Sequence, residues 1–177
     1  MEMNLTMLPQ PNVPNKNGII FDADALKTAM DNYNTNVVQA KRAIVYSSIP
    51  KAMNDYQCPL TDAVGLIESI TFDSAKNAYV ASMRLMDTPL GYDLKKSLAG
   101  ESPEHLSEMF VLGTNKIAEL NPEDFGNDKV ICSDPALRVD SCTLMSNPEY
   151  NLDNVININV GPVSSVEDVQ EKDTEPE

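Results

Sequence analysis

Hydrophobic and polar residues alternate most regularly in the middle of the chain, in two runs that lie close together. Residues 64–72 and 79–86 form these runs, and the polar segment Asp73–Asn77 connects them. Alternation with a period of two is typical of a strand with one buried face, and a short polar connection favours a hairpin. We therefore predict a hairpin whose second strand turns one set of residues to a single face, namely Tyr79, Ala81, Met83 and Leu85.

A helical period precedes this hairpin. Leu26, Met30 and Tyr33 are separated by four and then three residues, which places them on one face of a helix. Either Asp22 or Asp24 is a suitable N-cap, because a carboxylate there accepts a hydrogen bond from the first turn. We predict that this helix ends at Asn34–Asn36.

A second helix is predicted directly after the hairpin. Thr88 is a favourable N-cap, and Pro89 stands at the first helical position, where its missing N–H costs nothing. Leucine recurs every four residues from Leu90 to Leu98, and Gly100 is placed to end the helix.

Shorter apolar segments complete the pattern and are candidate strands. Together with the hairpin and the helices, they predict an α+β domain over residues 1–162, rich in strands and decorated by two or three helices. The additional candidate strands are residues 4–8, 43–46, 109–112, 130–132, 142–145 and 155–160.

The composition changes near the C-terminus. Residues 167–177 contain six acidic groups and one Lys, without an aromatic residue. Such a segment buries too little apolar area to offset the entropy of ordering it. We predict a mobile acidic tail over residues 163–177.

Charge and reactive side chains exclude several classes of function. The net charge of -14 disfavours binding to nucleic acid or to an anionic membrane. No apolar run is long enough to span a membrane, and Met1–Asn4 does not resemble the start of a secretory signal. Three scattered cysteines and one histidine, His105, predict neither a disulfide framework nor a zinc site, so no metal or other cofactor is expected. We interpret the cysteines as small buried side chains.

Several motifs follow one another along residues 15–150. Asn15–Phe21 contains an Asn-Lys-Asn-Gly turn, Val64–Asp73 is largely apolar, and Met86–Leu98 joins a strand to a helix through Asp-Thr-Pro-Leu-Gly. Val111–Gly113 and Leu144–Pro148 come later in the chain. In this order the motifs resemble the prohead (head-maturation) proteases of tailed phages. The resemblance implies a compact β-barrel flanked by helices, the fold that this family shares with herpesvirus assembly proteases.

The resemblance also implies a serine nucleophile activated by a histidine base. A serine hydroxyl is a weak nucleophile until a neighbouring base takes its proton. In this sequence the segment that matches the family's histidine is Val45–Pro50, and Ile49 occupies the histidine position. Because isoleucine accepts no proton, the family's base is missing at that position.

The segment that matches the nucleophile is Leu106–Gly113. Aligned on its last two residues, it has Glu108 and Met109 at the family's two serine positions, whereas a gap would place Ser107 at the nucleophile. If His105 and Ser107 lay on a strand, they would be about 6–7 Å apart along the backbone. A base must come within about 3 Å of the proton it takes. We therefore interpret Glu101–His105 as an exposed polar loop and the site as catalytically lost.

These observations lead to one main hypothesis and two alternatives. The main hypothesis is that the chain is not an enzyme but an auxiliary capsid (decoration or cement) protein of a phage virion. It would bind the major capsid protein and other copies of itself, after assembly in the host cytoplasm. The first alternative is an active prohead maturation protease with a rearranged site that uses Ser107 and His105. The second is an internal scaffold or assembly protein.

Overall fold

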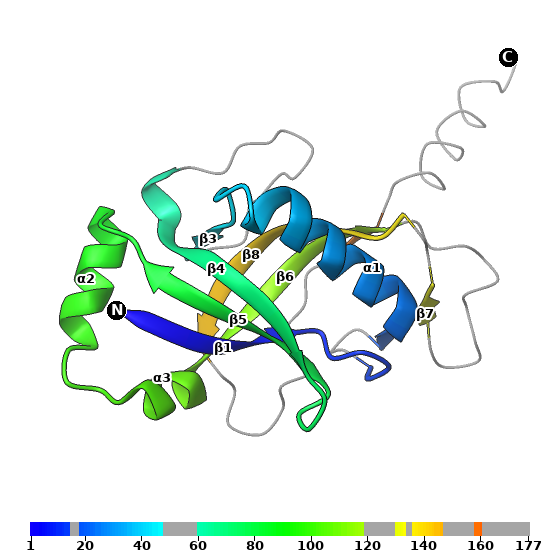
Figure 1. Cartoon of the computed structure of the whole chain (residues 1–177), viewed down its shortest axis with the longest axis horizontal. Coiled ribbons are helices and arrows are strands. Elements are labelled where there is room, and N and C mark those ends of the chain that lie inside the picture. Colours follow the sequence, from blue (N-terminus) through cyan, green and yellow to red (C-terminus); the bar gives the residue numbers. More distant parts are fainter. Residues whose placement is uncertain (15–17, 48–59, 119–129, 134–135, 147–157, 161–177) are drawn as a thin grey trace, which may run out of the picture.

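A closed six-stranded barrel forms the centre of the molecule (Figure 1). The computed structural model describes residues 1–14, 18–47, 60–118, 130–133, 136–146 and 158–160. Hydrogen bonding joins neighbouring strands in the order β1-β5-β4-β3-β8-β6, and β6 pairs with β1 to close the barrel. The strands are β1 (Glu2–Leu8), β3 (Ile44–Tyr46), β4 (Ala63–Asp73), β5 (Ala78–Leu85), β6 (Phe110–Ala118) and β8 (Arg138–Ser146).

Smaller elements surround the barrel. Strand β9 (Ile158–Val160) pairs with the end of β6, and β2 (Ile19–Phe21) pairs with β7 (Val130–Cys132). The helices are α1 (Ala23–Tyr33), α2 (Pro89–Ser97) and α3 (Pro103–Met109), with a 3-10 turn, η3 (Leu60–Asp62), and a π-helical turn, η1 (Asn34–Val38). This arrangement confirms the predicted α+β barrel with two or three flanking helices.

The predicted hairpin is confirmed as β4 and β5. The two strands are antiparallel, with Phe72 opposite Tyr79 and Asp73 opposite Ala78. In the connection, Asp73 Oδ1 accepts hydrogen bonds from the backbone N–H groups of Ala75 and Lys76. The face that the sequence pattern selected is the buried one, because Tyr79, Ala81, Met83 and Leu85 all lie in the core.

Helix α1 begins and ends where the sequence predicts. Asp22 is the N-cap, and its carboxylate accepts from the N–H of Ala25 at 3.2 Å. The α-helix ends at Tyr33 with Asn34 as its C-cap, and the chain continues as the π-helical turn η1 to Val38. The predicted face is buried against the barrel, and Tyr33 Oη lies 3.9 Å from Cys142 Sγ of β8.

Helix α2 has the predicted cap, and two of the three leucines of the predicted row face the core: Leu98 is buried and Leu94 is partly buried against it. Thr88 Oγ1 accepts from the N–H of Gly91 at 3.1 Å and donates to the carbonyl of Ala63 at 2.6 Å. Leu90 is 37% exposed, whereas Gly91 is buried. A Cβ at Gly91 would lie 2.1 Å from the carbonyl oxygen of Met86. Helix α2 therefore packs against the backbone of Met86 at a position where only glycine fits.

Two expectations near the proposed nucleophile are corrected. Glu101–His105 is not a loop throughout, because Ser102 caps α3 and accepts from the N–H of His105 at 3.1 Å. The strand predicted over residues 109–112 extends to Ala118. The prediction for the cysteines is confirmed at Cys132 and Cys142, which are buried, whereas Cys58 and the predicted acidic tail lie outside the described residues.

Candidate functional site

Three strands bring the segments that resemble the protease motifs to one end of the barrel. Strand β3 ends at Tyr46, which pairs with Thr143 of β8, and Thr143 pairs in turn with Gly113 of β6. Strand β8 ends at Ser146, opposite Phe110, the first residue of β6. Tyr46 and Gly113 are therefore about 10 Å apart, at two strand spacings, and the chain leaves β3 and enters β6 on the same side of the barrel. We call this region, with α3 leading into β6, the α3 end.

Ser107 lies on α3, next to the start of β6. Its Oγ donates a hydrogen bond to the carbonyl oxygen of Glu104 at 2.7 Å. The side chain is half-buried, so an incoming group can reach it. In this conformation the hydroxyl proton is directed to the helix backbone.

His105 stands on the same helix between two carboxylates. Its Nε2 lies 3.6 Å from Glu101 Oε2, and its Nδ1 lies 3.8 Å from Glu108 Oε2. Positions two apart on a helix do not face each other. The structure therefore places His105 and Ser107 close in sequence without bringing the imidazole to the hydroxyl.

Of the other positions named from the resemblance, the structure describes two and leaves one outside the described residues. Glu108 and Met109 form the last turn of α3, with Glu108 exposed and Met109 partly buried against the core. Ile49, at the family's histidine position, lies outside the described residues. The described geometry thus places the nucleophile segment and gives no position for the family's base.

A second pair of reactive groups lies inside the barrel and was missed by the sequence reasoning. Lys116 Nζ donates to Thr114 Oγ1 at 2.6 Å and to the Thr114 carbonyl at 2.9 Å. Burial lowers the pKa of Lys116 to about 7, so the amine is largely neutral above that pH. A hydroxyl beside a neutral amine is a combination that proteins use for nucleophilic catalysis.

Thr114 and Lys116 are excluded from catalysis because a substrate cannot reach them. Thr114 and Lys116 are fully buried, and Thr114 Oγ1 donates to the Leu8 carbonyl at 2.6 Å. The ammonium end of Lys116 also lies 4.9 Å from the centroid of the Phe21 ring. Burial likewise raises the pKa of the nearby Cys142 thiol to about 12, which leaves it an inert thiol. The Thr114 hydroxyl instead joins β6 to β1, at the place where these two strands close the barrel.

The described part of the chain offers neither a metal site nor a membrane-spanning helix. Among those residues, no group of three or more His, Cys, Asp or Glu is placed to hold a metal ion. None of the described helices combines the length and the apolar character that a transmembrane helix needs.

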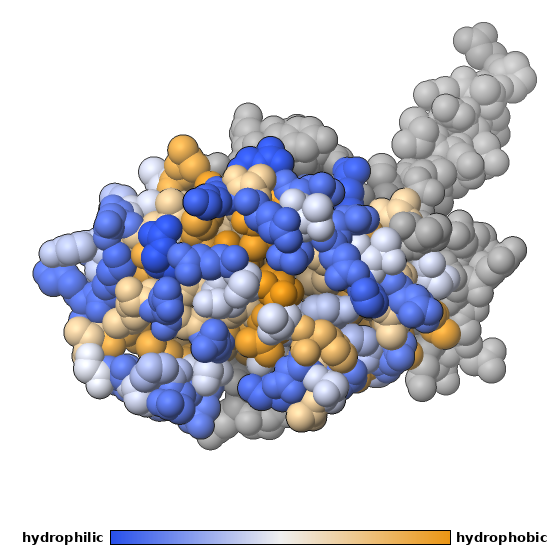
Figure 2. All heavy atoms as spheres, viewed as in Figure 1, coloured by the Kyte–Doolittle hydropathy of each residue, from blue (hydrophilic) through white to orange (hydrophobic). Residues whose placement is uncertain are grey.

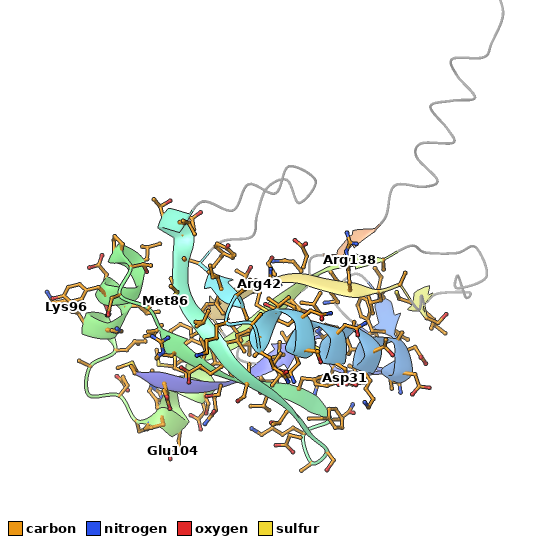
Figure 3. All side chains as sticks on the ribbon, turned by 45° about the horizontal axis from the view of Figure 1, so that its top comes forward. Asp31, Arg42, Met86, Lys96, Glu104 and Arg138 are labelled. Atoms are coloured by element: carbon orange, nitrogen blue, oxygen red, sulfur yellow. The ribbon has the colours of Figure 1, made fainter. Side chains whose placement is uncertain are left out.

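The two ends of the molecule differ in character. Figure 3 places Lys96 of α2 and Glu104 of α3 toward one end, and Asp31 of α1 toward the other. The α3 end carries the candidate nucleophile, whereas a cavity of about 490 Å³ lies between α1 and the β4–β5 hairpin. The candidate catalytic residues and the cavity therefore lie at different places in this fold.

Comparison with known proteins gives one informative likeness. No family model matches the chain, and no curated protein sequence matches it. Among solved structures, the chain is similar to the capsid assembly protease of bacteriophage T4, with a TM-score of 0.58 and 16% sequence identity. The match covers 80% of this chain and 80% of that protein. At this identity the likeness shows the fold.

This likeness corrects the expectation that the chain is not an enzyme. That expectation rested on matching short segments such as Val45–Pro50 and Leu106–Gly113 to the family's catalytic motifs. The fold that the chain shares belongs to a protease, and nothing in the described residues shows a loss of activity. Substitutions at motif positions are therefore no ground for excluding catalysis in this chain.

Proposed function

We propose that this chain is a serine-type protease of phage head assembly that cleaves capsid or scaffold proteins while the prohead forms. The observation that carries the proposal is the fold, shared with the T4 capsid assembly protease over 80% of both chains. The order of motifs along residues 15–150, which resembles prohead proteases, supports it independently. The net charge of -14 favours basic segments as substrates, because opposite charges steer encounter.

Ser107 is the proposed nucleophile and His105 the proposed base. In the described conformation they stand two positions apart on α3, so the pair forms only if this helix opens. Helix α3 has seven residues, and Leu106 is its one fully buried side chain. The free energy needed to open it locally is therefore small. We infer a latent enzyme in which contact with the substrate or the capsid lattice opens α3.

A carboxylate beside the base completes the proposed site. Glu101 and Glu108 already face the two ring nitrogens of His105. Once α3 opens, one carboxylate that stays beside the ring would orient it, while the other nitrogen takes the proton of Ser107. The role proposed for these two glutamates is therefore to position His105.

The proposal implies specific partners and a place. The chain would act inside the prohead against the major capsid protein or a scaffold protein, next to other copies of itself. The acidic charge and the exposed position of α3 both suit contact with a basic protein surface.

Two measurements test the function together. The full chain is incubated with proheads of the same phage, and cleavage is read by mass spectrometry. In parallel, a fluorophosphonate probe labels any activated serine. We expect cleaved capsid or scaffold protein and labelled Ser107, and Ser107→Ala should lower both signals at least 1,000-fold.

Ser97→Ala is a matched control, because Ser97 Oγ donates to the carbonyl of Asp93 on α2 much as Ser107 Oγ does on α3. This variant should cleave as the parent does. Intact prohead proteins together with no labelled serine would overturn the protease. Cleavage with the label on another serine would keep the protease and overturn the assignment of Ser107.

A further inference from the structure

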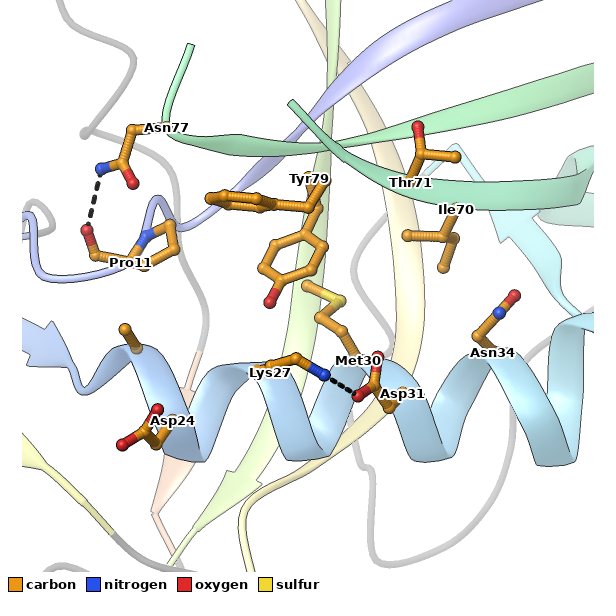
Figure 4. A pocket seen from close by; sticks show the side chains of 12 residues that line it. Pro11, Asp24, Lys27, Met30, Asp31, Asn34, Ile70, Thr71, Asn77 and Tyr79 are labelled. Carbon is orange, nitrogen blue, oxygen red and sulfur yellow. Dashed lines mark hydrogen bonds and ion pairs between the residues drawn. The ribbon is translucent and has the colours of Figure 1, made fainter. Parts of the chain in front are cut away.

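The cavity between α1 and the β4–β5 hairpin has an apolar wall at the rim of the core. It is lined by Met30 of α1 and by Ile70, Phe72 and Tyr79 of the hairpin, and Figure 4 shows Met30, Ile70 and Tyr79 with the helix below them. Phe72 is 48% exposed, and its ring centroid lies 5.0 Å from that of Tyr79. At about 490 Å³, the cavity is in the range that binding sites occupy and holds one large apolar side chain with space around it.

The strand that borders this cavity has a free edge. Strand β4 pairs with β3 only at its beginning, with Ala63 opposite Tyr46 and Leu66 opposite Ile44. From Ser69 to Asp73 it pairs with β5 on one side, and no described strand lies on its other side. Every second residue of such a strand directs its N–H and C=O away from the partner strand. An open edge of this kind is a template for adding another strand.

The cavity, the larger of two hollows in this region, lies beside this free edge. We call the cavity and the edge together the β4 groove, bounded by residues 70–72 of β4 on one side and residues 24–34 on the other. The second hollow, of about 300 Å³ and lined by Leu66 and Ile67 among others, lies where β4 is already paired, because Leu66 stands opposite Ile44 and the Ile67 N–H donates to the Ala43 carbonyl. Figure 2 shows hydrophobic residues exposed in the middle of the face on which β4 passes α1 in Figure 1. From Ser69 to Asp73 an extended chain covers about 13 Å.

The charges of the β4 groove make it acidic. Lys27 pairs with Asp31, so these two charges cancel within the groove. Asp24 also lines the larger hollow and makes no ion pair with another described residue. A bound segment therefore meets a negative charge beside the larger hollow. The net charge of -14 adds a preference for a basic segment.

We propose that the β4 groove binds an extended, basic segment of another protein, which adds as a strand to the free edge of β4. One large apolar side chain of the segment fills the larger hollow, and a basic residue lies near Asp24. Alternate residues of a strand point the same way, which suits an apolar and a basic side chain on one face of the segment. The acidic segment 163–177 of this chain has the wrong charge for the groove. Docking at this groove does not depend on cleavage at the α3 end.

A short peptide tests this proposal with the full chain. The probe is a fluorescein-labelled peptide, Lys-Thr-Phe-Thr-Val-Thr, whose Lys, Phe and Val share one face when extended. Fluorescence anisotropy should report binding that weakens at least tenfold when Phe is replaced by Ala or Lys by Glu. Two further peptides carry N-methyl groups on alternate residues, and one of them should lose binding, because only one set of N–H groups faces β4.

Variants of the protein locate the site. Phe72→Ala should weaken binding at least fivefold, whereas Tyr92→Ala is the matched control, an exposed aromatic residue on α2 at the other end. Ser107→Ala should bind the peptide like the parent, which separates this proposal from the protease.

Three outcomes would overturn the docking site. The first is equal binding by both N-methylated peptides, and the second is equal loss in Phe72→Ala and Tyr92→Ala. The third is tighter peptide binding after removal of residues 163–177, since the occupant would then be this chain's own tail.

Discussion

Lys116 Nζ lies 2.6 Å from Thr114 Oγ1 in a part of the barrel where both side chains are completely buried. No ion pair with an Asp or Glu of the described residues accompanies the amine, whose contacts are the two Thr114 oxygens and the face of Phe21. A buried charge without a counter-ion is costly, and the lowered pKa of Lys116, at about 7, expresses that cost.

Replacing Lys116 by a side chain of similar length without a charge should stabilise the fold. We expect Lys116→Met to raise the free energy of unfolding by about 1–3 kcal/mol at pH 7, because desolvation is relieved and packing volume is kept. Urea denaturation measures this change. Lys76→Met, at an exposed position of the hairpin connection, should change it by less than about 0.5 kcal/mol. A clear loss of stability in Lys116→Met would show that the amine holds the barrel together.

The same residue predicts a dependence of stability on pH. The pKa of Lys116 is about 7 in the folded chain, whereas a lysine in water has a pKa of 10.5, so between these values the unfolded chain binds more protons. Stability contributed by this group therefore rises as pH increases through that window, by about 2 kcal/mol from pH 7 to pH 9. Above pH 9 the raised pKa of Cys142 acts in the opposite direction, because the unfolded thiol loses its proton first.

Denaturation under reducing conditions at pH 7 and pH 9 checks this slope. The comparison of parent and Lys116→Met isolates the lysine, since all other groups titrate in both proteins. The variant should lose the increase of about 2 kcal/mol. Identical slopes in the two proteins would mean that Lys116 keeps an ordinary pKa.

The contact of α2 with the barrel predicts a severe effect of a single methyl group. In Gly91→Ala the new Cβ would lie 2.1 Å from the Met86 carbonyl oxygen, so the helix must shift away from the strand. We expect a loss of about 3 kcal/mol in the free energy of unfolding. Asp93→Ala, on the exposed face of the same helix, should be nearly neutral. Similar urea midpoints for the two variants would show that α2 is loosely attached.

The proposed opening of α3 predicts a variant with increased activity. Ser102→Ala removes the oxygen that accepts from the His105 N–H, which should destabilise α3 by about 1 kcal/mol. If opening limits cleavage, the free chain should cleave a capsid-derived peptide about fivefold faster. The Ser97→Ala control should keep the parent rate. A slower Ser102→Ala enzyme would indicate that an intact α3 is the active form.

The sequence predicts the elements whose pattern is local. Asp22 and Thr88 cap their helices as expected, because an N-cap acts within one turn. The hairpin was predictable for the same reason, since its alternation and its polar connection lie in one stretch. In the leucine row of α2, Leu94 and Leu98 pack on the core as the pattern predicts, whereas Leu90 is exposed and the close approach to the strand is made at Gly91 instead.

The candidate site was less predictable, because it depends on pairing between distant strands. Thr114-Asn115-Lys116 has the polarity of a connection, yet all three side chains are buried in the middle of β6. Asn115 is satisfied by Ser141 and Thr143 of β8, contacts that no local pattern reveals. For the same reason the local patterns revealed neither the pairing of β1 with β6 nor the surroundings of Ser107, and the barrel itself was predicted only through the family resemblance.

Closure of the barrel by β1 and β6 has a consequence for how the chain is made. The hydrogen bond from Thr114 to Leu8 joins residues 106 positions apart. At about 5–20 residues per second, a ribosome needs roughly 5–20 s to synthesise that interval. Until β5 has been synthesised β1 has neither neighbour, and after that it still lacks β6 on its other edge. Its buried side chains Met3, Leu5, Met7 and Leu8 therefore remain in an unfinished sheet throughout the interval. The nascent chain is therefore most exposed to aggregation, or to capture by a chaperone, before β6 has been synthesised.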